Sequence, residues 1–192
     1  DIISYYELSD NECSLNEIKK ISASFKKIIG VFPNIPWDGT TFSANNYVPN
    51  MRSFAKKIVD ISHSYKQILF IIRVHPAEKK RKDNKTNESF LDFVKNYDIR
   101  NNFKIIESDS SISSYNLFQL IDASIVYHTT LALEMAVQKI PVLQLGNGNT
   151  SNKNCCYEVD NDQKLFYYIN EILMNKLKIS STMYEDVLRY AY

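Results

Sequence analysis

The apolar run from Ile68 to Ile72 limits the possible folds of this chain more than any other feature. Five consecutive apolar residues, followed closely by Pro76, are typical of a strand buried on both faces. Such strands occur mainly in parallel sheets, where helices cover both faces. The run therefore predicts a central strand of an α/β domain.

Strand and helix patterns alternate along the rest of the chain. Apolar residues at helical spacing predict helices, and short apolar runs predict further strands. The expected strands are 27–32, 103–106, 124–127 and 141–145, and the expected helices are 14–25, 51–65, 88–97, 115–121, 131–138, 161–177 and 182–190. This alternation favours a three-layer, doubly wound, mainly parallel Rossmann-like α/β fold.

The composition argues against several classes of protein. Hydrophobic residues make up 44% of the 192 residues, as in folded domains, and a net charge of +1 offers no general attraction to nucleic acid. Cys13, Cys155 and Cys156 suit neither a disulfide framework nor a metal site, so free thiols in the cytoplasm are expected. No apolar run approaches the roughly 18 residues of a transmembrane segment. Because the chain begins with Asp1, we expect a piece of a longer protein.

Polar or glycine residues follow four of the expected strands. These segments are 34–38, 73–75, 128–130 and 146–149. In an open parallel sheet the carboxyl ends of all strands lie at one edge, where ligands bind. We therefore expect the four segments to converge on one anion-binding site.

The segment after the 68–72 strand carries the most specific chemistry. Arg73 offers a fixed cationic fork to an anion, with a surface arginine that covers a loop as the alternative. His75 is expected to contact a ligand, with a core histidine bonded to a backbone carbonyl as the alternative. Pro76 ends the strand and keeps His75 extended at its exit.

Other polar residues at this edge have two interpretations each. Thr129 and Thr130 either grip a phosphate at a helix N-terminus or simply cap that helix. Glu134 either accepts hydrogen bonds from a sugar diol or is a solvated carboxylate. Trp37 either lies flat against a ligand whose hydroxyls Asp38 accepts, or packs before a turn.

The chain lacks the motifs of several enzyme classes. It contains no glycine-rich dinucleotide fingerprint, phosphate loop, nucleophile elbow or metal-spaced cluster, which argues against dehydrogenases, kinases, esterases and zinc hydrolases. The basic segment 79–85 lacks interleaved aromatic residues, so we expect a solvated loop that attracts phosphorylated or lipid-linked substrates. Among the functions considered, nucleotide binding that does not use a glycine-rich loop remains compatible with the sequence.

Taken in order, the motifs resemble those of bacterial capsule polysaccharide biosynthesis proteins. The matching segments are 32–38, 71–78, 110–111, 120–123, 127–134 and 139–142. The chain looks like the C-terminal, donor-binding half of a two-lobed glycosyltransferase of the GT-B type, and the resemblance covers about residues 28–146. Similar His-Pro motifs are found in bacterial sialyltransferases and Kdo transferases.

The resemblance implies roles for individual residues. His75 and Pro76 match the motif that contacts the phosphate of the activated sugar, with His75 as the catalytic residue. Thr129 and Thr130 match a hydroxyl pair that binds the same phosphate, although serine is usual there. Glu134 matches the acidic residue that commonly holds the ribose.

The remaining candidates complete a nucleotide-binding set, namely Arg73, Asn34, Trp37, Asp38 and Ser111. The implied mechanism stabilises charge on the leaving phosphate without a metal or another cofactor. The implied partners are a nucleotide-activated sugar, with CMP favoured over UDP or GDP, and a saccharide or lipid-linked acceptor.

The resemblance also implies a domain organisation. Residues 1–26 are expected to form a lead-in segment and helix, 27–177 the nucleotide-sugar-binding domain, and 178–192 a C-terminal helix that packs on a missing N-terminal lobe. The expected location is the cytoplasm, with peripheral association at the inner face of the membrane as a variant. Three alternatives stay open: a CDP-glycerol-type glycerophosphotransferase of teichoic-acid assembly, a non-catalytic binding subunit, and a sugar-nucleotide epimerase.

Overall fold

The computed structural model describes residues 15–37, 47–81 and 88–191, and this part of the chain is built on one parallel sheet. Its six strands lie in the order β3-β2-β1-β4-β5-β6, and every neighbouring pair is parallel. They are β1 (Lys27–Phe32), β2 (Ile68–Arg73), β3 (Phe103–Ile106), β4 (Ala123–Val126), β5 (Val142–Gln144) and β6 (Tyr157–Glu158).

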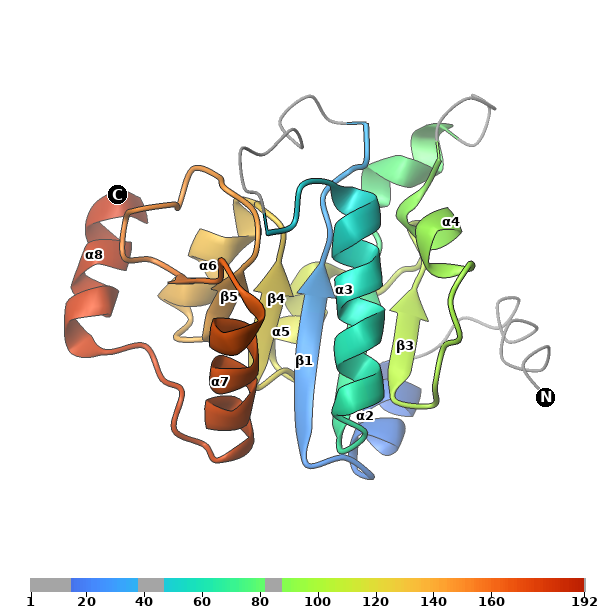
Figure 1. The fold of residues 1–192 in the computed structure, drawn as a ribbon, viewed down its shortest axis with the longest axis horizontal. Coiled ribbons are helices and arrows are strands. Elements are labelled where there is room, and N and C mark those ends of the chain that lie inside the picture. The colour runs from blue at the N-terminus through green and yellow to red at the C-terminus, as the bar shows by residue number, and fades with distance from the viewer. Residues whose placement is uncertain (1–14, 38–46, 82–87, 192) are drawn as a thin grey trace.

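Helices cover both faces of the sheet (Figure 1). On one face lie α3 (Met51–Ser64), α4 (Phe90–Val94) and α7 (Asp162–Leu173). On the other lie α2 (Leu15–Ser22), α5 (Ser114–Phe118), α6 (Leu131–Val137) and α8 (Ser181–Ala191). A short 3-10 helix, η3 (Pro76–Arg81), follows β2. The predicted three-layer, doubly wound α/β fold is confirmed.

The β2 strand explains why two separate cores form. Successive side chains of a strand point to opposite faces. Ile68, Phe70 and Ile72 therefore enter the core beneath α3, α4 and α7, whereas Leu69 and Ile71 enter the core on the other face. All six residues of β2 are buried, as the apolar run predicts. β2 lies between β3 and β1, and the middle of the sheet is the β1–β4 pair.

The observed elements differ from the predicted ones mainly in length. α4 and α5 have five residues each, so both are shorter than their apolar patterns indicate. The β6 strand escapes prediction because two residues cannot show a period. η3 occupies the start of the charged segment in which a loop is expected, since a short 3-10 turn leaves no amphipathic signature.

The strand order places a binding crevice by topology. β1 leads into α3 on one face, and β4 leads into α6 on the other. Adjacent strands whose connections depart to opposite faces leave a crevice at their carboxyl ends, where ligands of such sheets bind. The β1–β4 edge is therefore where the predicted polar segments should meet.

Both terminal helices of the described chain pack on the sheet. Ile18 of α2 and Val187 of α8 are 1% and 0% exposed and belong to the same core. Cys155 and Cys156 are buried free thiols, as predicted. Within the described residues, no helix combines the length and apolar character that crossing a membrane requires.

Candidate functional site

Two strand exits that are distant in sequence are joined by Asn34 and His128. Asn34 follows β1 and His128 follows β4, and β1 and β4 are neighbours in the sheet. The Asn34 Oδ1 accepts a hydrogen bond from the His128 backbone N–H at 3.1 Å, and the Asn34 Nδ2 lies 3.4 Å from the His128 Nδ1. The side chain of Asn34 thus holds the backbone and the ring of His128 across the crevice.

The exit of β5 packs closely against this pair. A Cβ atom at Gly148 would lie 2.6 Å from the Cβ of His128, closer than any ordinary contact. Gly148 donates its N–H to Ser151, and Gln144 at the end of β5 bonds to both Ser151 and Thr150. Three of the four predicted segments therefore meet at one edge, and any side chain larger than that of glycine at position 148 would clash with the Cβ of His128.

The Arg73 guanidinium forms hydrogen bonds with backbone carbonyl oxygens of the protein. The side chain is buried, with 4% exposure, and its guanidinium donates to the carbonyl oxygens of Ile112 at 2.8 Å, Val74 at 2.7 Å, Glu107 at 2.6 Å and Ser110 at 3.4 Å. Burial lowers the pKa of Arg73, and the nearby Asp109 carboxylate acts in the opposite direction. Arg73 thus holds the loop after β3, in contrast to the predicted open fork for an anion.

The His75 ring has a defined orientation. It is half-buried, and its Nδ1 accepts a hydrogen bond from the Ala77 backbone N–H at 3.1 Å. A neutral imidazole that accepts at Nδ1 carries its proton on Nε2, so the opposite ring nitrogen is a hydrogen-bond donor. Pro76 is exposed and begins η3, as expected of a residue that ends the strand.

Thr129 and Thr130 lie where β4 turns into α6. Thr130 is exposed and occupies the N-cap position, yet its side chain makes no capping hydrogen bond. The Thr129 hydroxyl accepts a hydrogen bond from the Leu131 N–H at 3.4 Å. Thr129 therefore bonds to the backbone at the start of α6 as a capping residue would, Thr130 does not, and phosphate binding by the pair stays a prediction.

Glu134 contacts another side chain of the protein, and Ser111 lies at the surface. One carboxylate oxygen of Glu134 accepts a hydrogen bond from the Tyr115 hydroxyl at 2.6 Å, and this contact raises the pKa of Tyr115. Ser111 is exposed. Its neighbour Ser113 forms a capping box with Asn116 at the start of α5, which explains part of the hydroxyl-rich segment. Trp37 is half-buried, and Asp38 lies outside the described residues.

Glu78 is a buried carboxyl group close to His75 to which the sequence analysis assigns no role. Its side chain is 6% exposed, and its Oε2 accepts a hydrogen bond from the Phe90 backbone N–H, the first of α4, at 3.2 Å. Burial raises the pKa of Glu78 to about 7, and the nearby Asp92 carboxylate adds to the shift. In the sequence, Glu78 lies three residues after His75, at the end of the matching segment 71–78.

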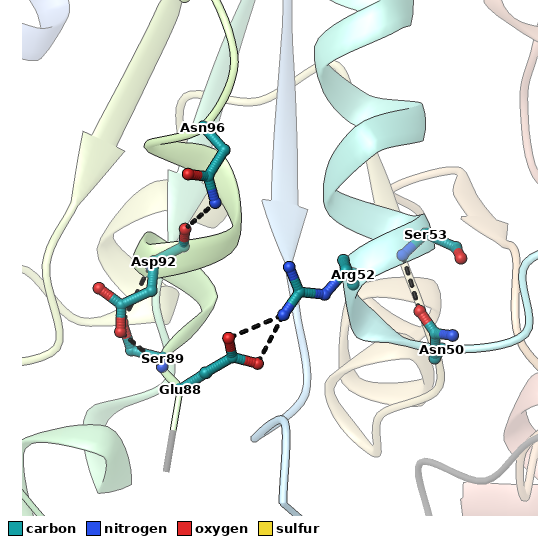
Figure 2. A network of polar contacts seen from close by, with 7 residues as sticks. All are labelled: Asn50, Arg52, Ser53, Glu88, Ser89, Asp92 and Asn96. Atoms are coloured by element: carbon teal, nitrogen blue, oxygen red, sulfur yellow. Dashed lines mark hydrogen bonds and ion pairs between the residues drawn. The ribbon is translucent and has the colours of Figure 1, made fainter. Parts of the chain in front are cut away.

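The start of α4 is also held by a polar network at its exposed side (Figure 2). Arg52 of α3 donates to both carboxylate oxygens of Glu88 at 2.7 Å, and Ser89 and Asp92 form a capping box. The Arg52 guanidinium also lies 4.8 Å from the centre of the Phe93 ring. These contacts join the start of α4 to α3.

A cavity of about 430 Å³ lies at the opposite, amino edge of the sheet. Lys27 at the start of β1 lines it together with Asp122 and Pro141, which precede β4 and β5. Three of its charged groups contact other protein groups, since Lys27 Nζ lies 2.5 Å from Asp122 and Lys139 Nζ lies 4.8 Å from the centre of the Tyr184 ring. This cavity is remote from the polar strand exits.

Comparison by sequence finds no relative. No protein-family model matches the chain, and no curated protein matches it.

Comparison by structure finds similar folds. KpsC of Thermosulfurimonas dismutans, a beta Kdo 2,4 transferase, matches with a TM-score of 0.54 at 8% identity, covering 93% of this chain and 55% of that one. MnaA of S. aureus, solved with UDP, matches with a TM-score of 0.57 at 13% identity, covering 95% and 43%. The UDP-GlcNAc 2-epimerase of Methanocaldococcus jannaschii matches with a TM-score of 0.53 at 17% identity, covering 97% and 51%.

These matches concern the fold and about half of each neighbour. The chain spans between 43% and 55% of the three proteins, while nearly all of this chain is covered. At such low identities the likeness supports no residue role. The chain therefore has the Rossmann-like fold of one half of GT-B-type proteins.

Proposed function

We propose that this chain is the nucleotide-sugar-binding half of a glycosyltransferase that builds bacterial surface polysaccharide. The observation that carries the proposal is the meeting of polar residues from separate strands at the β1–β4 edge, where Asn34 holds His128. Ligands of open parallel sheets bind at this place. The fold shared with a Kdo transferase and with a UDP-bound protein supports the same assignment.

In the proposed mechanism the site stabilises charge that develops on the leaving phosphate. His75 donates from Nε2, because Ala77 already occupies its Nδ1, and the hydroxyls of Thr129 and Thr130 supply further hydrogen bonds. Glu134 and the Asn34–His128 pair are proposed to contact the nucleoside part. Such groups act without a metal, and the acceptor and its catalytic base belong to another lobe.

Arg73 enters this proposal as a residue that orders the loop after β3. Its hydrogen bonds to four carbonyl oxygens leave the guanidinium poorly suited to a phosphate. Trp37, Asp38 and Ser111 remain proposed ligand contacts of the neighbouring segments.

Nucleotide titration tests the proposal. We expect CMP, UDP or GDP to bind the chain in the millimolar range by isothermal titration calorimetry, and His75→Ala or Thr129→Val to weaken binding about tenfold. Asp60→Ala, which removes an exposed ion pair with Lys56 within α3, is the control and should leave the affinity unchanged. Absence of binding by all three nucleotides, together with unchanged transfer by the His75→Ala form of the whole protein, contradicts the proposal.

The UDP-GlcNAc 2-epimerase neighbour favours a second candidate function. An epimerase half would use the same edge to hold UDP-GlcNAc, and the whole protein would act without an acceptor. Product analysis separates the two candidates. A transferase consumes an acceptor, whereas an epimerase converts or cleaves UDP-GlcNAc in its absence.

A further inference from the structure

We propose that Glu78 is the positioning residue that holds His75 in its working orientation, an inference that rests on the proposed function of His75. The Glu78 backbone N–H donates to the His75 carbonyl at 3.0 Å, so the two residues belong to one hydrogen-bonded turn. The Glu78 side chain leaves this turn and bonds to the first N–H of α4. Glu78 therefore ties the His75 turn to a helix.

The helix that receives this bond is firmly packed. Phe90 is 1% exposed, and its ring centre lies 6.2 Å from that of Phe54 on α3. On the other side of His75, the Val74 N–H donates to the Ile106 carbonyl at 2.9 Å. His75 thus lies between two anchored residues, and the anchor on its C-terminal side is Glu78.

The chemistry of this anchor is unusual for a carboxyl group. Within the described residues, Oε1 of Glu78 is buried without a hydrogen-bond partner. A buried carboxylate with one neutral hydrogen bond is poorly compensated, so the uncharged form is favoured. The raised pKa of Glu78 agrees with this. A neutral carboxyl can hold the Phe90 N–H, and a glutamine side chain can reproduce that contact.

The nitrogen chemical shifts of the His75 ring provide a test that does not depend on nucleotide. In the wild-type chain we expect His75 to show one dominant tautomer, with the proton on Nε2. Glu78→Ala should shift its ring nitrogens toward the averaged values of a mobile imidazole, whereas Glu78→Gln should keep the wild-type pattern. Glu88→Ala is the matched control, because Glu88 also holds the start of α4 but through the exposed contact with Arg52.

Two outcomes overturn the inference. One is a folded Glu78→Ala chain with unchanged His75 signals, and the other is an equal change in Glu88→Ala. If Glu78→Ala does not fold, Glu78→Asp decides, because its shorter side chain keeps the carboxyl group but should lose the Phe90 contact and mobilise His75.

Nucleotide binding separates this inference from the proposed function. If both hold, Glu78→Ala weakens the binding of CMP, UDP or GDP about tenfold, like His75→Ala, and Glu78→Gln does not. If the wild-type chain binds none of these nucleotides, the proposed function is contradicted. The chemical shifts of the His75 ring would still test the role of Glu78 in that case.

Discussion

At the scale of single residues, Arg73 illustrates how burial changes the role of a charged side chain. A guanidinium presents N–H donors in a fixed fork, and four backbone carbonyls satisfy that fork in this protein. Three of these carbonyls, those of Glu107, Ser110 and Ile112, belong to the loop after β3. The guanidinium of Arg73 thus closes the loop after β3 by binding its backbone carbonyls.

Replacing Arg73 should therefore destabilise the protein. Arg73→Ala leaves buried carbonyls unsatisfied, and we expect a loss of about 3 kcal/mol in unfolding free energy by urea denaturation. Arg73→Lys should recover only part of this loss, because an ammonium lacks the planar fork. A stable Arg73→Ala chain that no longer binds nucleotide would contradict this role and favour the anion-binding interpretation.

At the scale of elements, the starts of α5 and α6 differ although both follow hydroxyl-rich segments. Ser113 caps α5 through a capping box, whereas at the start of α6 Thr129 accepts a backbone hydrogen bond and Thr130 makes no side-chain capping bond. A hydroxyl that stabilises no helix is available for a different task. This contrast supports the proposed role of Thr130.

The two positions form a matched pair of mutations. Ser113→Ala should lower the unfolding free energy by about 1 kcal/mol, the usual value of an N-cap. Thr130→Ala should change it by less than about 0.5 kcal/mol, because the exposed side chain has no capping bond to lose. Nucleotide affinity should fall in Thr130→Ala and stay close to the wild-type value in Ser113→Ala. Equal destabilisation by both mutations would contradict this assignment.

The contact between η3 and α4 should make stability depend on pH. The pKa of Glu78 rises from 4.5 to about 7 on folding because the carboxyl group is buried, with Asp92 as the nearby charge. A raised acid pKa means that the folded state binds the proton more tightly, so the contribution of Glu78 to stability is fully present below pH 4.5 and is lost as the pH rises toward 7. The expected loss is about 3 kcal/mol.

Comparison with Glu78→Gln isolates this contribution. The amide does not titrate, so the unfolding free energy of the variant should lack the decline between pH 4.5 and about 7, the window set by the two pKa values. Urea denaturation at several pH values measures the difference. Parallel pH curves for the wild type and Glu78→Gln would exclude Glu78 as the cause.

At the scale of the whole molecule, α8 closes the core on one face of the sheet. Val187 is fully buried in the same cluster as Ala132 and Met135 of α6. Lys139 after α6 also lies over the Tyr184 ring of α8. The last helix is thus part of this domain, and its packing on another lobe stays a prediction.

Mutation of Val187 tests whether α8 is integral to the fold. Val187→Ala should cost about 2 kcal/mol and lower the melting temperature by about 4–8 °C, because it leaves a cavity in the core. Glu185→Ala, at an exposed position of the same helix, should change stability little. If both variants melt together with the wild type, α8 contributes little to the core.

Much of this architecture could be predicted from local sequence patterns. The apolar run at Ile68–Ile72 marks β2 because side-chain alternation and burial on both faces leave a plain signature in residue type. Prediction weakened where elements are very short, as for β6 and η3, since a period cannot appear within two residues or one turn. The sequence also predicted that polar residues follow the strands.

Tertiary structure alone decided which of these exits meet. Asn34 reaches His128 because β1 lies beside β4, and strand order is a property of the whole sheet. The partners of Arg73 are backbone carbonyls, which every residue type carries, so no sequence pattern identifies them. Glu78 is buried by a helix that begins twelve residues later. The sequence by itself determined the strands and their polar ends, whereas long-range packing determined which of those ends meet at one edge and which are held by the protein's own backbone.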